Sequence, residues 1–140
     1  MQAIKEYGPP ISLARARHLA DAAEAESARN GWAMVIAIVD SASHLILVHR
    51  MDHAQYGSIA IAQAKAKCAL DFKRPTKVFE DAVAQGGIGV RMLAVDGVCP
   101  LEGGVPILEN DRIIGAIGIS GALSHQDGLV AAAALQALGR

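Results

Sequence analysis

The chain has 140 residues and a net charge of −1, which fits one domain and argues against nucleic acid as a partner. Hydrophobic residues make up 52% of the chain, charged residues 19% and aromatic residues only 4%, so we expect an aliphatic, alanine-rich core. An apolar excess of this kind indicates that other copies of the chain cover part of the surface. We predict a single domain over residues 1–140, with 1–11 as an N-terminal arm, assembled as a homo-oligomer.

The two cysteines, Cys68 and Cys99, match neither a zinc-ligand spacing nor a redox pair. We therefore expect two buried thiols in a reducing compartment. The first residues do not resemble a signal peptide, and no apolar run is long enough to cross a membrane. The sequence predicts a cytoplasmic protein that does not interact with membranes.

The first half of the chain predicts two helices around a strand hairpin. Helical spacing of apolar residues indicates a helix over about 12–29, with a serine as its N-terminal cap. Residues 33–40 are apolar on both faces, which is typical of a central strand, and 44–50 alternate as the return strand. An alanine-rich helix is predicted over about 58–72, and Pro75 ends it.

The next segment is rich in glycine and lacks a strong periodic pattern. Thr76 is a suitable N-cap for a short helix to about Ala84. Residues 85–89 are expected to form a loop and residues 92–95 a short strand. The dipeptide Asp96-Gly97 signals a turn before the last part of the chain.

Residues 101–121 form the stretch around which the chain is organised. Two apolar runs flank the polar link Asn110-Asp111, which has the length and residue types of a tight hairpin turn. Gly115 and Gly118 remove side chains from the second run. Glycine in a strand marks a bulge or the close approach of another body, here a ligand, a packed helix or a neighbouring subunit.

Ser124 and Asp127 have a spacing similar to a capping box and predict a last helix over 124–138. The predicted order is therefore helix, two strands, helix, short helix, two or three strands and helix. Hairpin-linked strands combined with helices predict an antiparallel sheet with helices packed on its faces, an α+β fold.

Several polar residues could carry chemistry. His49 and His53 are four residues apart, but they straddle a strand end, whereas a metal pair with this spacing needs a helix, so we predict no metal site. Arg50 and Asp52 lie where the strand passes into the helix. They form either a salt bridge that fixes this turn or part of an anion site.

Lys65 and the stretch Glu102-Gly103-Gly104 are the other two features of this kind. Lys65 lies in an alanine-rich helix, either on a solvated face or as a functional amine. The backbone amides of the glycine pair could point at an anion. An arginine combined with such amides suits a carboxylate ligand, because guanidinium binds it through two hydrogen bonds.

A set of motifs in fixed order resembles the GlcG/HbpS-like family, a haem-degrading family that includes the C-terminal domain of PduO-type proteins. The motifs are Val39-Asp40, Arg50-Met51-Asp52, Lys65-Ala66, Arg74-Pro75-Thr76, Gly103-Gly104-Val105-Pro106-Ile107, Gly115-Ala116-Ile117-Gly118-Ile119-Ser120-Gly121 and Gln126-Asp127. The resemblance implies a profilin-like α/β sandwich, usually homo-oligomeric. It also implies haem or corrinoid-related binding for some members and roles in small-organic-acid breakdown for others.

We therefore expect an oligomeric small-ligand-binding protein that binds haem or a small organic acid. The alternative is an enzyme of small-organic-acid or aromatic-compound catabolism, a tautomerase, hydratase or dehalogenase acting on an unsaturated or hydroxylated carboxylate. A structural interaction module is a third interpretation. In the binding interpretation the ligand-binding residues are Arg50, Glu102, Gly103, Gly104 and Ser120, with the arginine, the glycine pair and the lysine helix facing one cavity.

In the enzyme interpretation, His53, Lys65 and Asp52 move protons, since a positioned acid or base is what enolisation or hydration requires. The family usually has glycine at the position of His53. If haem binds, the candidate axial ligands are His49, His53 and His125, and no spacing selects one of them.

Overall fold

The structure is a computed structural model that describes residues 5–139. Its helices are α1 (Leu13–Arg29), α2 (Gly57–Phe72), α3 (Lys77–Gln85), the 3₁₀ helix η1 (Gly87–Ala94) and α4 (Ser124–Leu138). Its strands are β1 (Glu6–Tyr7), β2 (Val35–Asp40), β3 (Leu45–Arg50), β4 (Gly104–Glu109) and β5 (Arg112–Ser120). Within this part of the chain, no helix has the length and apolar character that crossing a bilayer requires.

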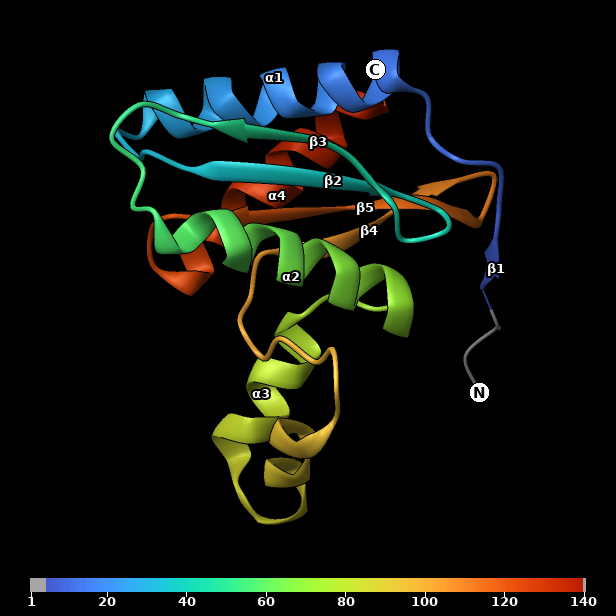
Figure 1. The fold of residues 1–140 in the computed structure, drawn as a ribbon, viewed down its shortest axis with the longest axis vertical. Helices are drawn as coiled ribbons and strands as arrows, with labels where there is room; N and C mark the ends of the chain where they lie inside the picture. Colours follow the sequence, from blue (N-terminus) through green and yellow to red (C-terminus); the bar gives the residue numbers. More distant parts are fainter. Residues whose placement is uncertain (1–4, 140) are drawn as a thin grey trace.

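The five strands form one sheet (Figure 1). Four of them pair in the order β1-β5-β2-β3, and β4 pairs with β5 in the antiparallel direction. Strand β2 lies between β3 and β5, antiparallel to both, which confirms the predicted central strand and its hairpin. Residues Glu6 and Tyr7, predicted only as part of an arm, pair in parallel with β5. The α+β fold class is thus confirmed.

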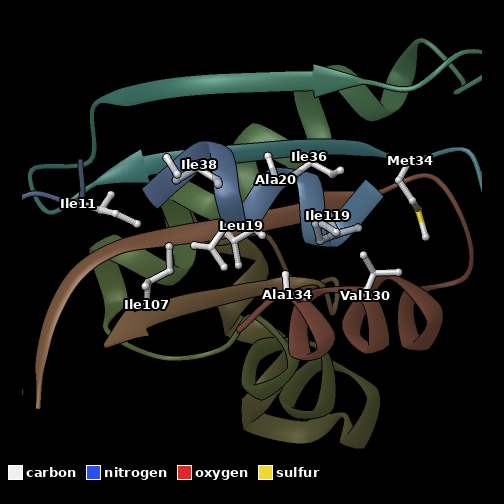
Figure 2. Close-up of a cluster of buried hydrophobic side chains, with 14 of the residues drawn as sticks. Ile11, Leu19, Ala20, Met34, Ile36, Ile38, Ile107, Ile119, Val130 and Ala134 are labelled. Carbon is white, nitrogen blue, oxygen red and sulfur yellow. The ribbon is translucent and has the colours of Figure 1, made fainter. Parts of the chain in front are cut away.

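The two apolar faces of β2 belong to two separate cores. Ile36 and Ile38 point into a cluster shared with α1 and α4 (Figure 2). Val35 and Ala37 point to the opposite face, where they pack against α2. Helices α1 and α2 therefore cover opposite faces of the sheet (Figure 1), and both faces of the central strand exclude water.

The predicted hairpin around Asn110 and Asp111 is confirmed. Both residues have positive φ, 50° and 64°, as the tight two-residue turn between twisted strands requires. The element that approaches Gly118 closely is helix α2, because a Cβ atom on Gly118 would lie 2.0 Å from the carbonyl oxygen of Ala62. At Gly115 the neighbouring strand fills the space, since a Cβ atom would meet Val39 O at 2.5 Å.

Three local predictions are wrong. The short strand expected at 92–95 is instead the end of η1, and the loop expected at 85–89 is mostly helical, because α3 runs to Gln85 and η1 begins at Gly87. The segment containing α3 and η1 projects away from the sheet (Figure 1), so no strand edge lies beside it for pairing. The turn at Asp96-Gly97 is confirmed, with a φ of 87° at Gly97.

The third correction concerns the start of α4. Ser12 caps α1 as predicted, since its hydroxyl accepts a hydrogen bond from Arg15 N at 3.2 Å. Ser124, in contrast, is already the first helical residue of α4. The cap position is Leu123, whose backbone amide donates to Gln126 Oε1 at 3.0 Å.

Candidate functional site

A surface hollow opens where β3 passes into α2, and we call it the Arg50 hollow. It has a volume of about 570 Å³ and is lined by Arg50, Met51, Asp52, His53, Ala54, Gln55 and Tyr56. A second hollow of about 590 Å³, the Glu24 hollow, lies against α1 and shares three of these residues, Arg50, Met51 and Asp52. The connection between β3 and α2 therefore presents polar side chains on two sides.

His53 occupies an unusual backbone conformation in this connection. Its φ is 72°, in the left-handed region that few residues other than glycine adopt. The tight turn around it is closed by a hydrogen bond from Ala54 N to Met51 O at 3.2 Å. The turn places the imidazole at the exposed rim of the Arg50 hollow, and backbone strain of this kind is concentrated at functional sites.

Arg50 and Asp52 do not form the salt bridge that the sequence allowed. Within residues 5–139, neither side chain has an ion-pair partner within 4.0 Å. The guanidinium group of Arg50 is exposed at the hollow, so its donors are open to an anion from solvent.

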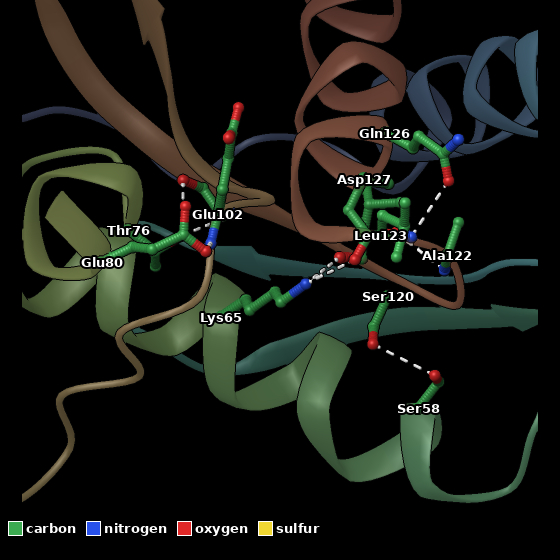
Figure 3. A network of polar contacts seen from close by, with 12 residues as sticks. Ser58, Lys65, Thr76, Glu80, Glu102, Ser120, Ala122, Leu123, Gln126 and Asp127 are labelled. Atoms are coloured by element: carbon green, nitrogen blue, oxygen red, sulfur yellow. Dashed lines mark hydrogen bonds and ion pairs between the residues drawn. The ribbon is translucent and has the colours of Figure 1, made fainter. Parts of the chain in front are cut away.

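Lys65 does not lie on a solvated helix face. It belongs to the buried face of α2 and is 1% exposed, and its Nζ atom lies 2.8 Å from Asp127 Oδ2 of α4 (Figure 3). The same atom donates to the carbonyl oxygen of Ile119 in β5, also at 2.8 Å. The amine therefore makes two hydrogen bonds inside the protein.

Asp127, which the sequence suggested as a capping residue, is the buried partner in this pair. Burial raises the pKa of the Asp127 carboxyl group, and the hydrogen bond from Lys65 opposes this shift. The other carboxyl oxygen, Oδ1, accepts from Ala122 N at 3.0 Å, so both oxygens are satisfied. The pair joins α2, α4 and the end of β5.

The glycine pair at the start of β4 lies against this network. Gly104 N donates to Thr76 Oγ1 at 2.9 Å, so this amide is used internally. A Cβ atom on Gly103, whose φ is 131°, would lie 3.0 Å from Lys65 Nζ. Glu102 N donates to Glu80 Oε1 at 3.2 Å (Figure 3). The glycines thus allow close packing of the loop on α2.

Ser120 connects the buried network to the hollow. Its hydroxyl lies 3.1 Å from Ser58 Oγ, at the start of α2. Gln55, which lines the Arg50 hollow, donates from Nε2 to the same Ser58 oxygen at 3.0 Å. A short chain of polar contacts therefore runs from the hollow to the end of β5.

The structure separates the expected site residues into two groups. Arg50 pairs with Val35, and Val35 pairs with Ser120, so two strand spacings, roughly 10 Å, separate Arg50 from Ser120. The Arg50 hollow contains Arg50, Asp52 and His53. The buried network contains Lys65, Glu102, Gly103, Gly104 and Ser120. The sequence analysis expected these residues to face a single cavity. The structure divides them between two places because β2 lies between β3 and β5.

Several polar residues of the hollow and the buried network lay outside the sequence-based site, among them Gln55, Tyr56, Ser58 and Asp127. Tyr56 is 82% exposed at the hollow. The chain has only two tyrosines, and this was the one feature of the sequence that could have drawn attention to it. Gln55 and Ser58 gave no signal, because polar residues are common at helix starts. The histidines also separate, since of His49, His53 and His125 only His53 lines the Arg50 hollow.

Comparison with known proteins places this arrangement in a family. Protein GlcG of Escherichia coli K12 is 35% identical over 110 residues, which cover 79% of this chain and 81% of GlcG. The crystal structure of Klebsiella pneumoniae protein ORFY superposes with a TM-score of 0.89 at 30% identity, covering 99% of this chain and 97% of that one.

A second solved structure is described as a complex of PduOC with haem. It superposes with a TM-score of 0.82 at 27% identity, over 91% of this chain and 94% of that chain. The model of the family described as "Haem degrading protein HbpS-like" matches residues 11–136, which include every strand after β1 and all of the helices except the last two residues of α4. The chain therefore belongs to the HbpS-like family.

Proposed function

We propose that this chain is a small-ligand-binding protein that holds a carboxylate-bearing molecule in the Arg50 hollow. The observation that carries the proposal is the guanidinium group of Arg50, which has no ion-pair partner among the described residues and faces a hollow of about 570 Å³. Guanidinium binds carboxylates through two parallel hydrogen bonds. Gln55 and Tyr56 supply further polar groups on the same lining.

Haem is the first ligand to consider, because it carries two carboxylates and an iron that accepts imidazole. His53 lies on the same lining as Arg50, so the residues present fit an axial ligand and a propionate partner. The haem complex of PduOC and the description of the family support this assignment. A small organic acid shares the carboxylate chemistry and would use Arg50 without His53.

The test is a pair of titrations, one with hemin and one with a small dicarboxylate. Arg50→Ala should weaken binding roughly 10- to 150-fold, because a charge-assisted hydrogen bond contributes about 1.5–3 kcal/mol. His53→Gly removes the imidazole at a position whose φ suits glycine. Arg112→Ala, in the β4–β5 hairpin, is the matched control and should bind like the parent.

The two titrations distinguish the ligands. Haem binding predicts a saturable shift of the Soret band that weakens in both Arg50→Ala and His53→Gly. A small acid predicts heat release in calorimetry that depends on Arg50 and not on His53. Equal affinity of Arg50→Ala and the parent for both ligands, with both proteins folded, would contradict the proposed site.

An enzymatic role is the second proposal, since Asp52 and His53 line the same hollow as Arg50. A carboxylate substrate held by Arg50 would place its neighbouring carbon atoms near an acid and a base. Lys65 lies in the buried network and therefore has no part in this proposed enzyme site. Turnover of an unsaturated or hydroxylated carboxylate, followed by NMR and lost in Asp52→Asn with binding retained, would support it.

We also propose that the chain is a homo-oligomer. Large apolar side chains are exposed on the projecting segment of α3 and η1, with Ile88 74% and Leu93 62% exposed. Val78 and Val90 are exposed on the same segment. A second copy of the chain is the partner that the apolar composition suggests, because exposed patches of this kind mark protein interfaces.

A further inference from the structure

The fold brings the two cysteines together, although they are 31 residues apart in the sequence. Cys68 lies on the buried face of α2, and Cys99 lies in the loop that returns from the projecting segment to β4 (Figure 1). The backbone N–H group of Cys99 donates a hydrogen bond to Cys68 Sγ at 3.3 Å. We propose that the two cysteines are a redox modification site, at which a small-molecule disulfide converts them into an intramolecular disulfide bond. The proposal is independent of the proposed function, because neither cysteine lines the Arg50 hollow.

The approach of the two backbones suits such a bond. The Cα atom of Cys99 is bonded to the nitrogen that contacts Cys68 Sγ, at about 1.46 Å, so it lies within about 4.8 Å of that sulfur atom. Cysteines joined by a disulfide have Cα atoms about 4.4–6.8 Å apart, which requires an approach of this kind. Rotation of the Cys99 side chain about its Cα–Cβ bond is the main movement that then brings the two sulfur atoms together.

The loop that carries Cys99 is built to allow a small adjustment. Its backbone hydrogen bonds are local, since Val98 N donates to Val95 O at 3.2 Å and Leu101 N donates to Cys99 O at 2.8 Å. Residues 95–103 belong to no strand, so forming the bond breaks no strand pairing. Helix α2 packs closely against β5 and keeps Cys68 in place.

The two thiols have different roles in the exchange. Cys68 is 0% exposed, whereas Cys99 is partly exposed, so a small disulfide reaches Cys99 first. The Cys99 thiolate attacks one sulfur atom of the small disulfide, whose S–S bond breaks and releases a thiolate that takes up a proton. Cys68 then attacks Cys99 Sγ in the mixed disulfide and releases the second small thiol. Two protein thiols are thus oxidised to one disulfide, one small disulfide is reduced to two thiols, and the two cysteine protons pass to the released thiols.

The surroundings of the two sulfur atoms fit this order but make the exchange slow. Burial raises the pKa of Cys99, and the ammonium group of Lys65 opposes this shift. Burial also raises the pKa of Cys68, and the N–H group of Cys99 opposes that shift by stabilising the thiolate that acts in the second step. Little thiolate is present at neutral pH, so the exchange should take hours rather than seconds.

The test incubates the full chain with millimolar oxidised glutathione under native conditions and then blocks free thiols with N-ethylmaleimide. We expect a species in the intact-mass spectrum that carries neither label nor glutathione, and a tryptic peptide pair joined through Cys68 and Cys99. The bond closes a loop that contains all of α3 and η1 and restricts the unfolded chain. The oxidised protein should therefore unfold at a temperature about 5–10 °C higher than the reduced protein.

Cys68→Ala and Cys99→Ala form a matched pair of variants, and circular dichroism checks that each is folded. Cys68→Ala should retain one glutathione on Cys99, because no second thiol displaces it. Cys99→Ala should stay unmodified, because its remaining thiol is fully buried. Oxidised glutathione should raise the unfolding temperature of neither variant.

Three results on the parent protein alone would overturn the proposal, whether or not the variants fold. They are two labelled thiols after several days of incubation, a stable glutathione adduct without an internal bond, and a disulfide that joins two chains. In each of these cases the contact between Cys99 N and Cys68 Sγ is only a hydrogen bond to a buried sulfur atom.

Discussion

Lys65 Nζ lies 2.8 Å from Asp127 Oδ2, and the two side chains are 2% and 3% exposed, between α2 and α4. The ion pair is complete, because the ammonium also donates to Ile119 O and the carboxylate also accepts from Ala122 N. Removing one member would leave the other charge buried and unpaired, which costs far more than the pair contributes as a whole.

The first prediction follows from this pair. Lys65→Met should lower the free energy of unfolding by about 3–5 kcal/mol, because Asp127 is left buried without its partner. Lys67→Met removes an exposed lysine that pairs with Asp71 at 3.4 Å, and it should cost less than about 1 kcal/mol. Urea denaturation of both variants gives the comparison. Equal urea midpoints for the two variants would show that the buried ion pair stabilises the fold no more than the exposed one.

The second prediction concerns the contact between β5 and α2. A Cβ atom on Gly118 would lie 2.0 Å from Ala62 O, so Gly118→Ala should destabilise the fold by at least about 2 kcal/mol. A Cβ atom on Gly57 would meet nothing within 4 Å, so Gly57→Ala should stabilise by about 0.4–1 kcal/mol. Thermal unfolding measures both, and a neutral Gly118→Ala would contradict the close packing.

The third prediction concerns the two thiols. Burial raises the pKa of Cys68, and burial also raises the pKa of Cys99, with Lys65 acting in the opposite direction. Both groups therefore carry little of the reactive thiolate at pH 8. The native protein should react with a thiol reagent at least about tenfold more slowly than the urea-unfolded chain. Fast labelling of the native protein would show that these thiols are accessible.

The fourth prediction tests the backbone at His53. A left-handed conformation costs about 1–2 kcal/mol for a residue with a Cβ atom, while glycine adopts it freely. His53→Gly should therefore be more stable than His53→Ala by about 1 kcal/mol, since φ is 72°. Urea denaturation of the two variants checks this. Identical stabilities would show that the turn relaxes around alanine.

The fifth prediction concerns assembly. Light scattering at micromolar concentration should give a mass at least twice the 14.6 kDa of one chain. Ile88→Lys and Leu93→Lys place charges on the exposed apolar segment and should shift the protein towards monomer. A monomeric parent would contradict the homo-oligomer, and oligomers unaffected by both substitutions would place the interface elsewhere.

The sequence predicted those parts of the fold whose cause is local. The apolar run in 33–40, the turn residues Asn110-Asp111 and the serine cap at Ser12 each act within a few residues, and each is confirmed. The strand expected at 92–95 failed because strands need a partner, and the projecting segment offers none.

The site was less predictable, because its contacts join residues far apart in the sequence. Lys65 and Asp127 are 62 residues apart, and nothing near either one signals the other. In the same way, nothing in the sequence indicated that His49 of β3 lies 3.3 Å from Glu24 of α1. Arg50, Asp52 and His53 line one hollow because they are close neighbours in the connection between β3 and α2.

The contacts of α2 with β5 have a consequence for ligand choice. Ser58 meets Ser120 near the first turn of the helix, and Lys65 meets Ile119 two turns later. Sliding or rotating α2 would break both contacts together, so the helix cannot adapt to an incoming molecule. The short connection ending at Tyr56 supplies the rest of the lining, and the hydrogen bond from Ala54 N to Met51 O closes its turn. The hollow should therefore select its ligand by shape and bind it without a large entropic penalty.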